Sequence, residues 1–442
     1  MAKVYTTINA NYRPNWNKSH GIREYLQNAK DAETQYLARM NVFHKNNTLF
    51  IENIGSTMSR EDLLLGTSSK VGNSQLIGQF GDGLKIGTLA LVRDGLSVKI
   101  RNGSEIWIPS IERSDKFQAN VLAFNITDSK NFENRVSIEV KGIGYTDYKQ
   151  ICENFLWLAD KKSLNADSVV KTDYGDLLLA DCYKGKLFVK GIFVQYDEKL
   201  DYGYNLSDAE TDIERRIVNY YDKNYAISRI WNAAINTRPD LFEKFFDMLD
   251  LGSQDLEGIN EYSVSNMSDD VKTKVVDRFK YRNGNDAIPV ASLSESKEAA
   301  HLGKTGIITN KALNSILTNK MGNFAVVKNT LRQETINFYS WNQLESSEHQ
   351  VIDFTIQLMS KVNDKVSIDD IDIVDFRDDS LMGLFKDGRI QIARKLTVDK
   401  IQFMRTYIHE LAHKITMAPD GDKRHVACIE EMWAKLWSQS YN

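Results

Sequence analysis

The stretch Glu24-Tyr25-Leu26-Gln27-Asn28-Ala29-Lys30-Asp31 decides how the first third of this chain is interpreted. It belongs to a helical pattern over residues 15–42 whose apolar face is formed by Ile22, Leu26 and Ala29. Glu24 and Asn28 are one helical turn apart, and Asp31 follows three residues later, so these side chains project to one side. The pattern predicts a helix that packs on a core and presents a polar site.

The polar face of this helix suits a magnesium-nucleotide site. A carboxamide such as Asn28 can hold Mg²⁺ between triphosphate oxygens. A carboxylate one turn earlier, here Glu24, can orient and deprotonate the attacking water. The pair therefore predicts binding and hydrolysis of ATP with Mg²⁺ as cofactor.

Glycine-containing segments follow downstream. A strand over residues 48–52 runs into a turn at Asn53-Ile54-Gly55, a loop contains Gly66-Thr67-Ser68-Ser69-Lys70, and an apolar helix opens with Ile77-Gly78-Gln79-Phe80-Gly81-Asp82-Gly83-Leu84-Lys85. Glycines remove side chains that would keep backbone amides from phosphates, and the helix presents its positive end to them. Lys70 and Lys85 can add countercharge.

In this order the segments resemble the motifs of the GHKL ATPase superfamily, which includes gyrase B subunits, MutL proteins, ninety-kilodalton heat-shock chaperones and histidine kinases. Its first motif, Glu-x-x-x-Asn-x-x-Asp, looks like Glu24, Asn28 and Asp31, and Thr67-Ser68-Ser69-Lys70 resembles the MutL lid. The resemblance implies a Bergerat α/β sandwich over residues 1–148, a homodimer formed through it, Asn28 as magnesium ligand and Glu24 as general base.

The middle motif departs from the family pattern at Asn53, where the family has an adenine-reading aspartate. An amide can pair with adenine but can also accept other bases, so base specificity stays open. The neighbouring Glu52 is expected on the opposite strand face. The nucleotide-binding residues that the resemblance implies are Asn28, Asp31, Asn53, Gly55, Met58, Thr67, Ser68, Lys70, Gly78, Gly81, Gly83, Leu84 and Lys85.

Residues 149–325 give a weaker pattern. The β-rich run over residues 186–194 predicts a strand that resembles the second domain of GHKL clamps, with Lys186 or Lys190 as a basic residue for the γ-phosphate or as part of a solvated face. Helices are predicted near residues 207–236, 239–250 and 268–280, and a small βαβα unit over residues 287–319. No chemistry is visible in this region.

Near the other end, His409-Glu410-Leu411-Ala412-His413 has the spacing of a zinc-peptidase helix. Histidines at i and i+4 share a helix face and can bind one Zn²⁺, while Glu410 can polarise the metal-bound water. His425 is the first choice as third ligand, and Glu430 or Glu431 on the following helix is the alternative. Cys428 is a weaker candidate, because a lone cysteine is more often a core residue.

The elements around this motif resemble the minimal zincin fold. They are a helix near residues 345–362, strands near 371–376 and 388–393, a helix over 398–417 and a final helix over 423–438. A strand at Gly388–Ile392 is expected to offer an edge to which an extended substrate can add. The resemblance implies a metallopeptidase-like domain over residues 326–442 that acts on protein or peptide substrates.

The 442 residues exceed what one hydrophobic core normally holds, so three domains are predicted, over residues 1–148, 149–325 and 326–442. The expected class is α+β, with a GHKL α/β sandwich, an α/β middle domain and a zincin α+β domain. Apolar residues make up 42% and charged residues 26%, which excludes a chain dominated by disorder. The net charge of -4 gives no global reason to bind nucleic acid.

No signal peptide and no membrane span are expected from the apolar runs. Three isolated cysteines argue against a disulfide framework, which favours the cytoplasm. We expect either an ATPase that gates a zinc endopeptidase, or a chaperone-like or clamp-like ATPase whose zinc domain is structural or binds a partner. Glu410 favours the first, because a structural site needs no general base. By resemblance, the pairing suits a phage or bacterial conflict system.

Overall fold

The structure is a computed structural model that describes residues 2–63, 77, 82–160, 163–207, 209, 217 and 219–439. They form two compact units, Met1–Ala234 and Ile235–Asn442. Several sheets alternate with helices in both units, which confirms the predicted α+β class at this level. The division into three domains stays a prediction.

The first unit opens with an antiparallel sheet built around one long strand. Strand β5 (Ala119–Lys141) pairs with β4 (Ser97–Ser114) along one edge, and its other edge pairs first with β1 (Ala2–Asn9) and then with β3 (Thr48–Ile54). Strand β2 (Arg39–Lys45) completes the sheet beside β3. The 3₁₀ turn at Arg60–Leu63 follows β3.

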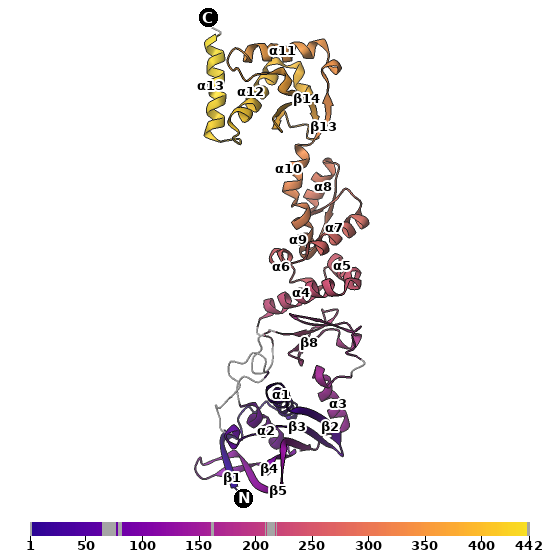
Figure 1. The fold of residues 1–442 in the computed structure, drawn as a ribbon, viewed down its shortest axis with the longest axis vertical. Coiled ribbons are helices and arrows are strands. Elements are labelled where there is room, and N and C mark those ends of the chain that lie inside the picture. The colour runs from indigo at the N-terminus through magenta and orange to yellow at the C-terminus, as the bar shows by residue number, and fades with distance from the viewer. Residues whose placement is uncertain are drawn as a thin grey trace. The chain divides into compact units, whose positions relative to one another are not determined.

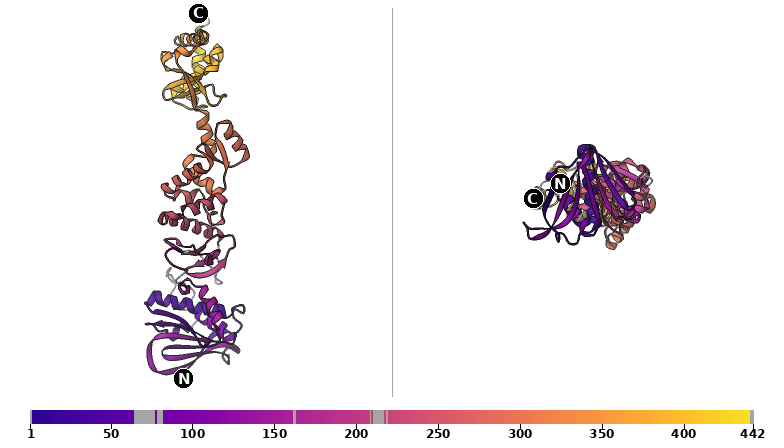
Figure 2. Two further views of the ribbon diagram at one scale, coloured as in Figure 1. Left: turned by 90° about the vertical axis from the view of Figure 1, so that its right-hand side faces the viewer. Right: turned by 90° about the horizontal axis from the view of Figure 1, so that it is seen from below.

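Two helices pack on this sheet, α1 (Lys18–Tyr36) and α2 (Gly83–Arg93) (Figure 1, Figure 2). Asn17 caps α1 by accepting from the backbone N–H groups of Ser19 and His20, which places the start inside the predicted range. The predicted end at residue 42 is wrong, because the left-handed Leu37 ends the helix and β2 follows. The helices approach closely because both carry glycine at the crossing: a Cβ on Gly21 would lie 2.6 Å from the carbonyl oxygen of Gly87. This close approach brings the polar face of α1 to the start of α2.

A second sheet follows helix α3 (Tyr145–Glu153) and the 3₁₀ turn Leu156–Leu158. Its order is β6-β7-β10-β8-β9, with only β10 and β8 parallel among its described strands. The strands are Val169–Thr172 (β6), Gly175–Leu178 (β7), Lys186–Val189 (β8), Ile192–Tyr196 (β9) and Gly203–Leu206 (β10). The single strand predicted over residues 186–194 is wrong, because the left-handed residues Lys190 and Gly191 turn it into a hairpin. Helix α4 (Tyr220–Thr237) is shorter than the helix predicted over residues 207–236.

The second unit begins with helices and a small parallel pair of strands. Strands β11 and β12 pair in parallel with α8 between them, as predicted for the βαβα unit. The elements are α5 (Phe242–Leu251), α6 (Glu261–Ser265), α7 (Asp269–Asn283), β11 (Ala287–Val290), α8 (Leu293–His301), β12 (Thr305–Ile308), α9 (Lys311–Met321) and α10 (Phe324–Arg332).

The last part of the second unit is a sheet of order β13-β14-β16-β15 with helices packed on it. Strand β16 pairs in parallel with β14 and antiparallel with β15, so it is internal. The elements are β13 (Thr335–Tyr339), α11 (Ser346–Met359), β14 (Ile371–Phe376), β15 (Gly383–Lys386), β16 (Arg389–Ala393), α12 (Lys400–Thr416) and α13 (Lys423–Gln439). The predicted edge strand at Gly388–Ile392 is therefore wrong, and the edge beside α12 is β15.

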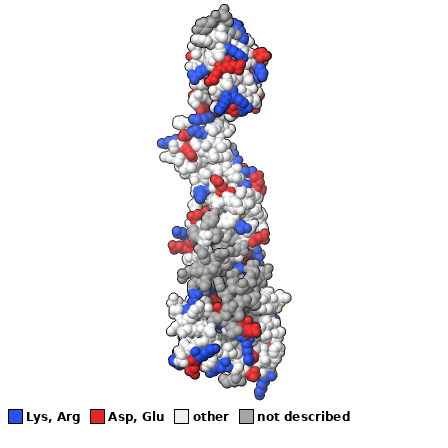
Figure 3. Space-filling model, turned by 90° about the vertical axis from the view of Figure 1, so that its left-hand side faces the viewer, with Lys and Arg blue, Asp and Glu red and all other residues white. Residues whose placement is uncertain are grey.

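No helix in the described ranges combines the length and apolar character needed to cross a membrane. On the face drawn in Figure 3, basic and acidic side chains are interspersed over the described residues. That mixture agrees with the small net charge of the sequence.

Candidate functional site

Helix α12 positions the first two histidines of the candidate metal site. Asp399 caps the helix through its carboxylate, which accepts from the N–H groups of Ile401 and Gln402. The helix ends at Met417, whose left-handed conformation (φ 51°) breaks the α-helical repeat. One face of α12 is buried in the core through Phe403, Tyr407, Ile408, Leu411 and Ala412. His409 and His413 lie one turn apart beside this buried face.

Four side chains converge beyond these histidines: His409, His413, Asp420 and His425. The Nε2 atoms of His409 and His413 are 3.2 Å apart, and Oδ1 of Asp420 lies 3.0 Å from the first and 3.2 Å from the second. One ligand atom from each residue falls within 4.8 Å of all the others. Three imidazoles and a carboxylate are the donors that Zn²⁺ takes in proteins, so this set fits zinc.

Backbone carbonyls orient two of the imidazoles. Nδ1 of His413 donates to the carbonyl oxygen of Ala418 (2.8 Å), which leaves the lone pair on Nε2. His425 comes from α13, is 2% exposed, and places its Nε2 3.3 Å from the carbonyl oxygen of His409. Burial lowers the pKa of His409, which favours the neutral ring that binds a metal.

Of the alternatives for the third ligand, the structure brings His425 to the site. Glu430 and Glu431 are exposed on α13, and Glu431 pairs instead with Lys435 (2.7 Å). Cys428 is half-buried against the core and also lies outside the cluster. Sequence reasoning missed Asp420, which follows α12 in a loop and has no periodic pattern. The sequence feature that could have indicated this ligand is a carboxylate between His413 and His425.

Glu410 lies on α12 between the two histidines and is 6% exposed. Burial raises its pKa to about 7, although the N–H of Phe385 on strand β15 donates to it. The strand approaches so closely because residue 383 is glycine: a Cβ there would lie 2.5 Å from Cγ2 of Thr406 and 2.9 Å from Cγ of Glu410. The edge strand thus holds the predicted general base beside the histidines.

In the first unit, Glu24 lies against the start of α2. A Cβ on Gly83, the first residue of that helix, would lie 2.2 Å from Oε2 of Glu24. Asn28 follows one turn later on α1 and is half-buried. The Glu24 carboxylate and the glycine at the N-terminus of α2 are therefore close together. Their role in a phosphate site stays a prediction.

Two other predicted nucleotide-binding residues, Asn53 and Asp31, make hydrogen bonds within the protein. Asn53 donates its amide to the carbonyl oxygen of Ala29 (2.8 Å), and Asp31 accepts from the N–H of Ile77 (2.7 Å), so both stabilise the protein around α1. Glu52 lies on the opposite strand face from Asn53, where it contacts Ser137 (3.1 Å), as expected. Their roles in nucleotide binding stay predictions.

The remaining predicted residues fall into three groups. Lys85 is fully buried, with Nζ 3.3 Å from Asp82 and 3.2 Å from the carbonyl oxygen of Asp62. Leu84 is a core residue, Gly55 has a φ of 105°, and the backbone of Met58 exchanges hydrogen bonds with the Asn102 amide. The predicted residues Thr67, Ser68, Lys70, Gly78 and Gly81 lie outside the described residues.

No protein-family model matches this chain, and a search of curated proteins finds no match either.

Proposed function

We propose that this chain is a zinc-dependent endopeptidase acting on protein substrates, and that ATP binding and hydrolysis in residues 1–148 gate its activity. The observation that carries the peptidase proposal is the convergence of His409, His413 and His425 beside Glu410. The sequence resemblance to GHKL ATPases and to minimal zincins supports the same assignment. The fold proposed for residues 1–148 is a Bergerat sandwich, and for residues 326–442 a minimal zincin.

The three histidines would hold the metal through ring nitrogens, with the Ala418 carbonyl oxygen keeping His413 in one tautomer. When bound, Zn²⁺ supplies Lewis-acid chemistry, which makes water more acidic and a peptide carbonyl carbon more electrophilic. Glu410 then takes a proton from the attacking water and delivers it to the leaving amine. Its buried position on α12 favours a single orientation for both transfers.

Strand β15 would align the substrate. It forms the end of its sheet beside α12, so an extended peptide could add to its outer edge. Such a peptide would run past Glu410, because Gly383 and Phe385 of β15 both contact that side chain.

For the nucleotide, Asn28 would hold Mg²⁺ and Glu24 would act as general base. The support is that the Glu24 carboxylate lies at the N-terminus of α2, where phosphate oxygens are stabilised by backbone N–H groups. The predicted homodimer through residues 1–148 belongs to the same proposal.

One observation favours the alternative, a clamp-like or chaperone-like ATPase with a structural zinc. Asp420 supplies a fourth protein ligand atom 3.0 Å from Nε2 of His409. Four protein ligands are typical of structural zinc sites, whereas catalytic sites keep one position open. The peptidase proposal therefore requires Asp420 to leave the metal. Its position in a loop, with 75% of its side chain accessible, leaves room for that movement.

The test combines metal content with cleavage of an unstructured protein, with and without Mg-ATP. We expect one zinc per chain and cleavage that is lost in Glu410→Gln with zinc retained. Changed cleavage in Glu24→Ala would support gating. Zinc without cleavage, with ATP turnover that disappears in Glu24→Ala, would instead support the alternative.

A further inference from the structure

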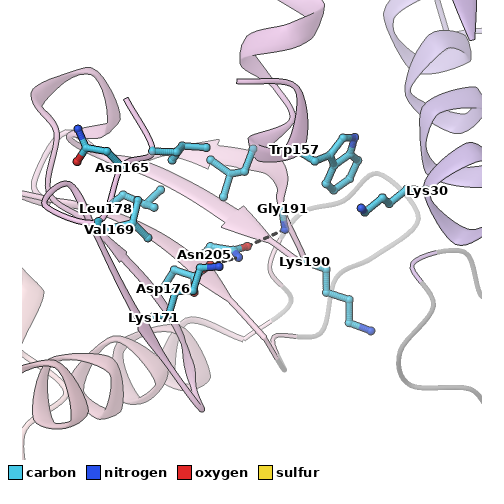
Figure 4. Close-up of a pocket in the computed structure, with 13 residues that line it drawn as sticks. Lys30, Trp157, Asn165, Val169, Lys171, Asp176, Leu178, Lys190, Gly191 and Asn205 are labelled. Carbon is cyan, nitrogen blue, oxygen red and sulfur yellow. Dashed lines mark hydrogen bonds between the residues drawn. The ribbon is translucent and has the colours of Figure 1, made fainter. Parts of the chain in front are cut away.

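A cavity of about 880 Å³ lies in the first unit beside the second sheet. Its wall combines residues from α1, from the turn after α3, and from strands and turns of that sheet (Figure 4). This volume falls in the range of small-molecule sites in proteins. Lys30, which reaches it from α1, follows Asn28 by two residues and so points about 200° around the helix from it. The cavity is therefore on a different side of α1 from the proposed nucleotide site.

The polar wall of the cavity is organised by a chain of hydrogen bonds. The N–H of Gly191 donates to Oδ1 of Asn205 (2.7 Å), and Nδ2 of Asn205 donates to Asp176 (2.8 Å). Gly191 has a φ of 78°, and a Cβ there would lie 2.8 Å from the Trp157 ring. The missing side chain lets the indole lie against the turn, which fixes the ring at the cavity wall.

The charges of the lining residues favour an anion. Lys30, Lys171 and Lys190 line the cavity, and Asp176 is the one acidic residue among the described lining residues. Asp176 already accepts a hydrogen bond from Asn205, while Glu33 outside the lining pairs with Lys30 (2.6 Å). An excess of ammonium groups over carboxylates attracts a negatively charged ligand.

The rest of the lining favours a planar, apolar ring. Trp157 offers its indole, and the Lys30 ammonium lies 5.9 Å from the centre of that ring. The apolar surface is extended by Leu156, Leu164, Val169 and Leu178. Indole faces stack on flat rings, and aliphatic side chains bury their edges.

We propose that this cavity binds a small anion that carries a planar ring, with the ring against Trp157 and the anionic group held by the lysine ammonium groups of the lining. The anionic group can be a phosphate or a carboxylate, because lysine ammonium groups bind both. This inference does not rest on the proposed peptidase or ATPase.

The probe is 8-anilino-1-naphthalenesulfonate, a ring-bearing anion that fluoresces in apolar sites, titrated into the full chain in the absence of nucleotide. We expect one saturable site. The double variant Lys171→Gln/Lys190→Gln should weaken it by about tenfold or more, because each charge-assisted contact is lost. Lys199→Gln is the matched control: this exposed lysine of the same region lies outside the lining and should leave binding unchanged.

Trp157→Ala should weaken dye binding and Trp157→Phe should restore much of it, which separates loss of the ring from loss of folding. Displacement by adenosine monophosphate but not by benzoate would assign a phosphate ligand, and the reverse a carboxylate. Equal dye affinity in all these folded variants, or displacement by neither competitor, would overturn the proposal. Mg-ATP binding lost in Asn28→Ala with dye binding intact would concern the nucleotide site alone.

Discussion

Oδ1 of Asp420 lies 3.0 Å from Nε2 of His409, although Asp420 comes from an exposed loop and His409 from a core helix. Substitution of Asp420 distinguishes a catalytic zinc site from a structural one. If Asp420 coordinates the metal only transiently, Asp420→Ala keeps zinc and raises cleavage, because a coordination position is freed. If it is a structural ligand, the variant loses zinc affinity by about 10-fold or more.

The measurement is zinc affinity by competition with a chromophoric chelator, together with the visible spectrum of the cobalt-substituted protein. Glu430→Ala is a suitable control, because Glu430 is an exposed carboxylate on α13 that lies outside the cluster. Equal zinc affinity, cobalt spectrum and cleavage in Asp420→Ala and wild type would remove Asp420 from the site.

Gly383 should be required for the position of Glu410. In Gly383→Ala the new Cβ meets Thr406 and Glu410 side chains at 2.5 and 2.9 Å, so strand β15 or the Glu410 side chain must shift. We expect a loss of about 1–3 kcal/mol in the free energy of unfolding, and reduced cleavage with zinc content unchanged. Both are measurable by denaturant titration and by kcat.

The control for this strand is Gly388→Asn in the same hairpin. Gly388 has a φ of 81° and no neighbour within 4 Å of a Cβ, and asparagine tolerates that conformation. If both substitutions affected cleavage equally, the specific contact with Glu410 would not explain the result.

The pair formed by Glu348 and Arg394 should make the second unit sensitive to acid. The Arg394 guanidinium, 3.0 Å away, lowers the pKa of Glu348 from 4.5 to about 2. A depressed carboxyl pKa stabilises the folded state at neutral pH, and this contribution is lost as the pH falls from about 4.5 towards about 2.

Arg394→Gln should therefore reduce the free energy of unfolding at pH 7, since it removes the charged partner of a buried carboxylate that keeps only the neutral donors of Thr397 and Glu345. The difference from wild type should shrink as the pH falls through this window. Arg389→Gln, which breaks a more exposed pair with Asp372, should cost less. Denaturant titrations between about pH 4.5 and pH 2 would measure this difference. If the difference between Arg394→Gln and wild type did not depend on pH, the pair would not be the cause of the acid sensitivity.

Variants of Asn28 and Glu24 should separate Mg-ATP binding from ATP hydrolysis. Asn28→Ala removes the predicted magnesium ligand and should weaken Mg-ATP binding by about tenfold or more. Glu24→Gln should keep binding but lower turnover by about 100-fold or more, because the general base is lost. Calorimetry and phosphate release measure the two effects.

Thr34→Ala on the exposed end of α1 is the matched control and should change neither quantity. Unchanged Mg-ATP binding in Asn28→Ala would argue against the predicted nucleotide site.

The elements with strong local signals were predicted well from sequence. The strand over residues 371–376 matches β14. The helix predicted over residues 398–417 begins two residues later, at Lys400, directly after the Asp399 cap. Alternating or helical periodicity and capping residues act over a few neighbours, so they can be recognised without the fold. His425 could be chosen because three of the 7 histidines, His409, His413 and His425, lie close together in the sequence.

Features that depend on distant contacts were missed. Asp420 reaches His409 and His413 because the chain turns back after the left-handed Met417, and no periodic pattern marks it. The edge position of β15 depends on the order of strands from four parts of the chain. The turn at Lys190-Gly191 was hidden within a run of β-forming residues, where two left-handed residues outweigh local propensity.

The candidate zinc ligands are divided between two helices and the loop that joins them. A metal held there would clip α13 to α12, and by mass action the clip strengthens as free zinc rises above its dissociation constant. When zinc is scarce, α13 would open more readily from α12 and become easier for a cellular protease to attack. The supply of metal would thus set how long the protein persists.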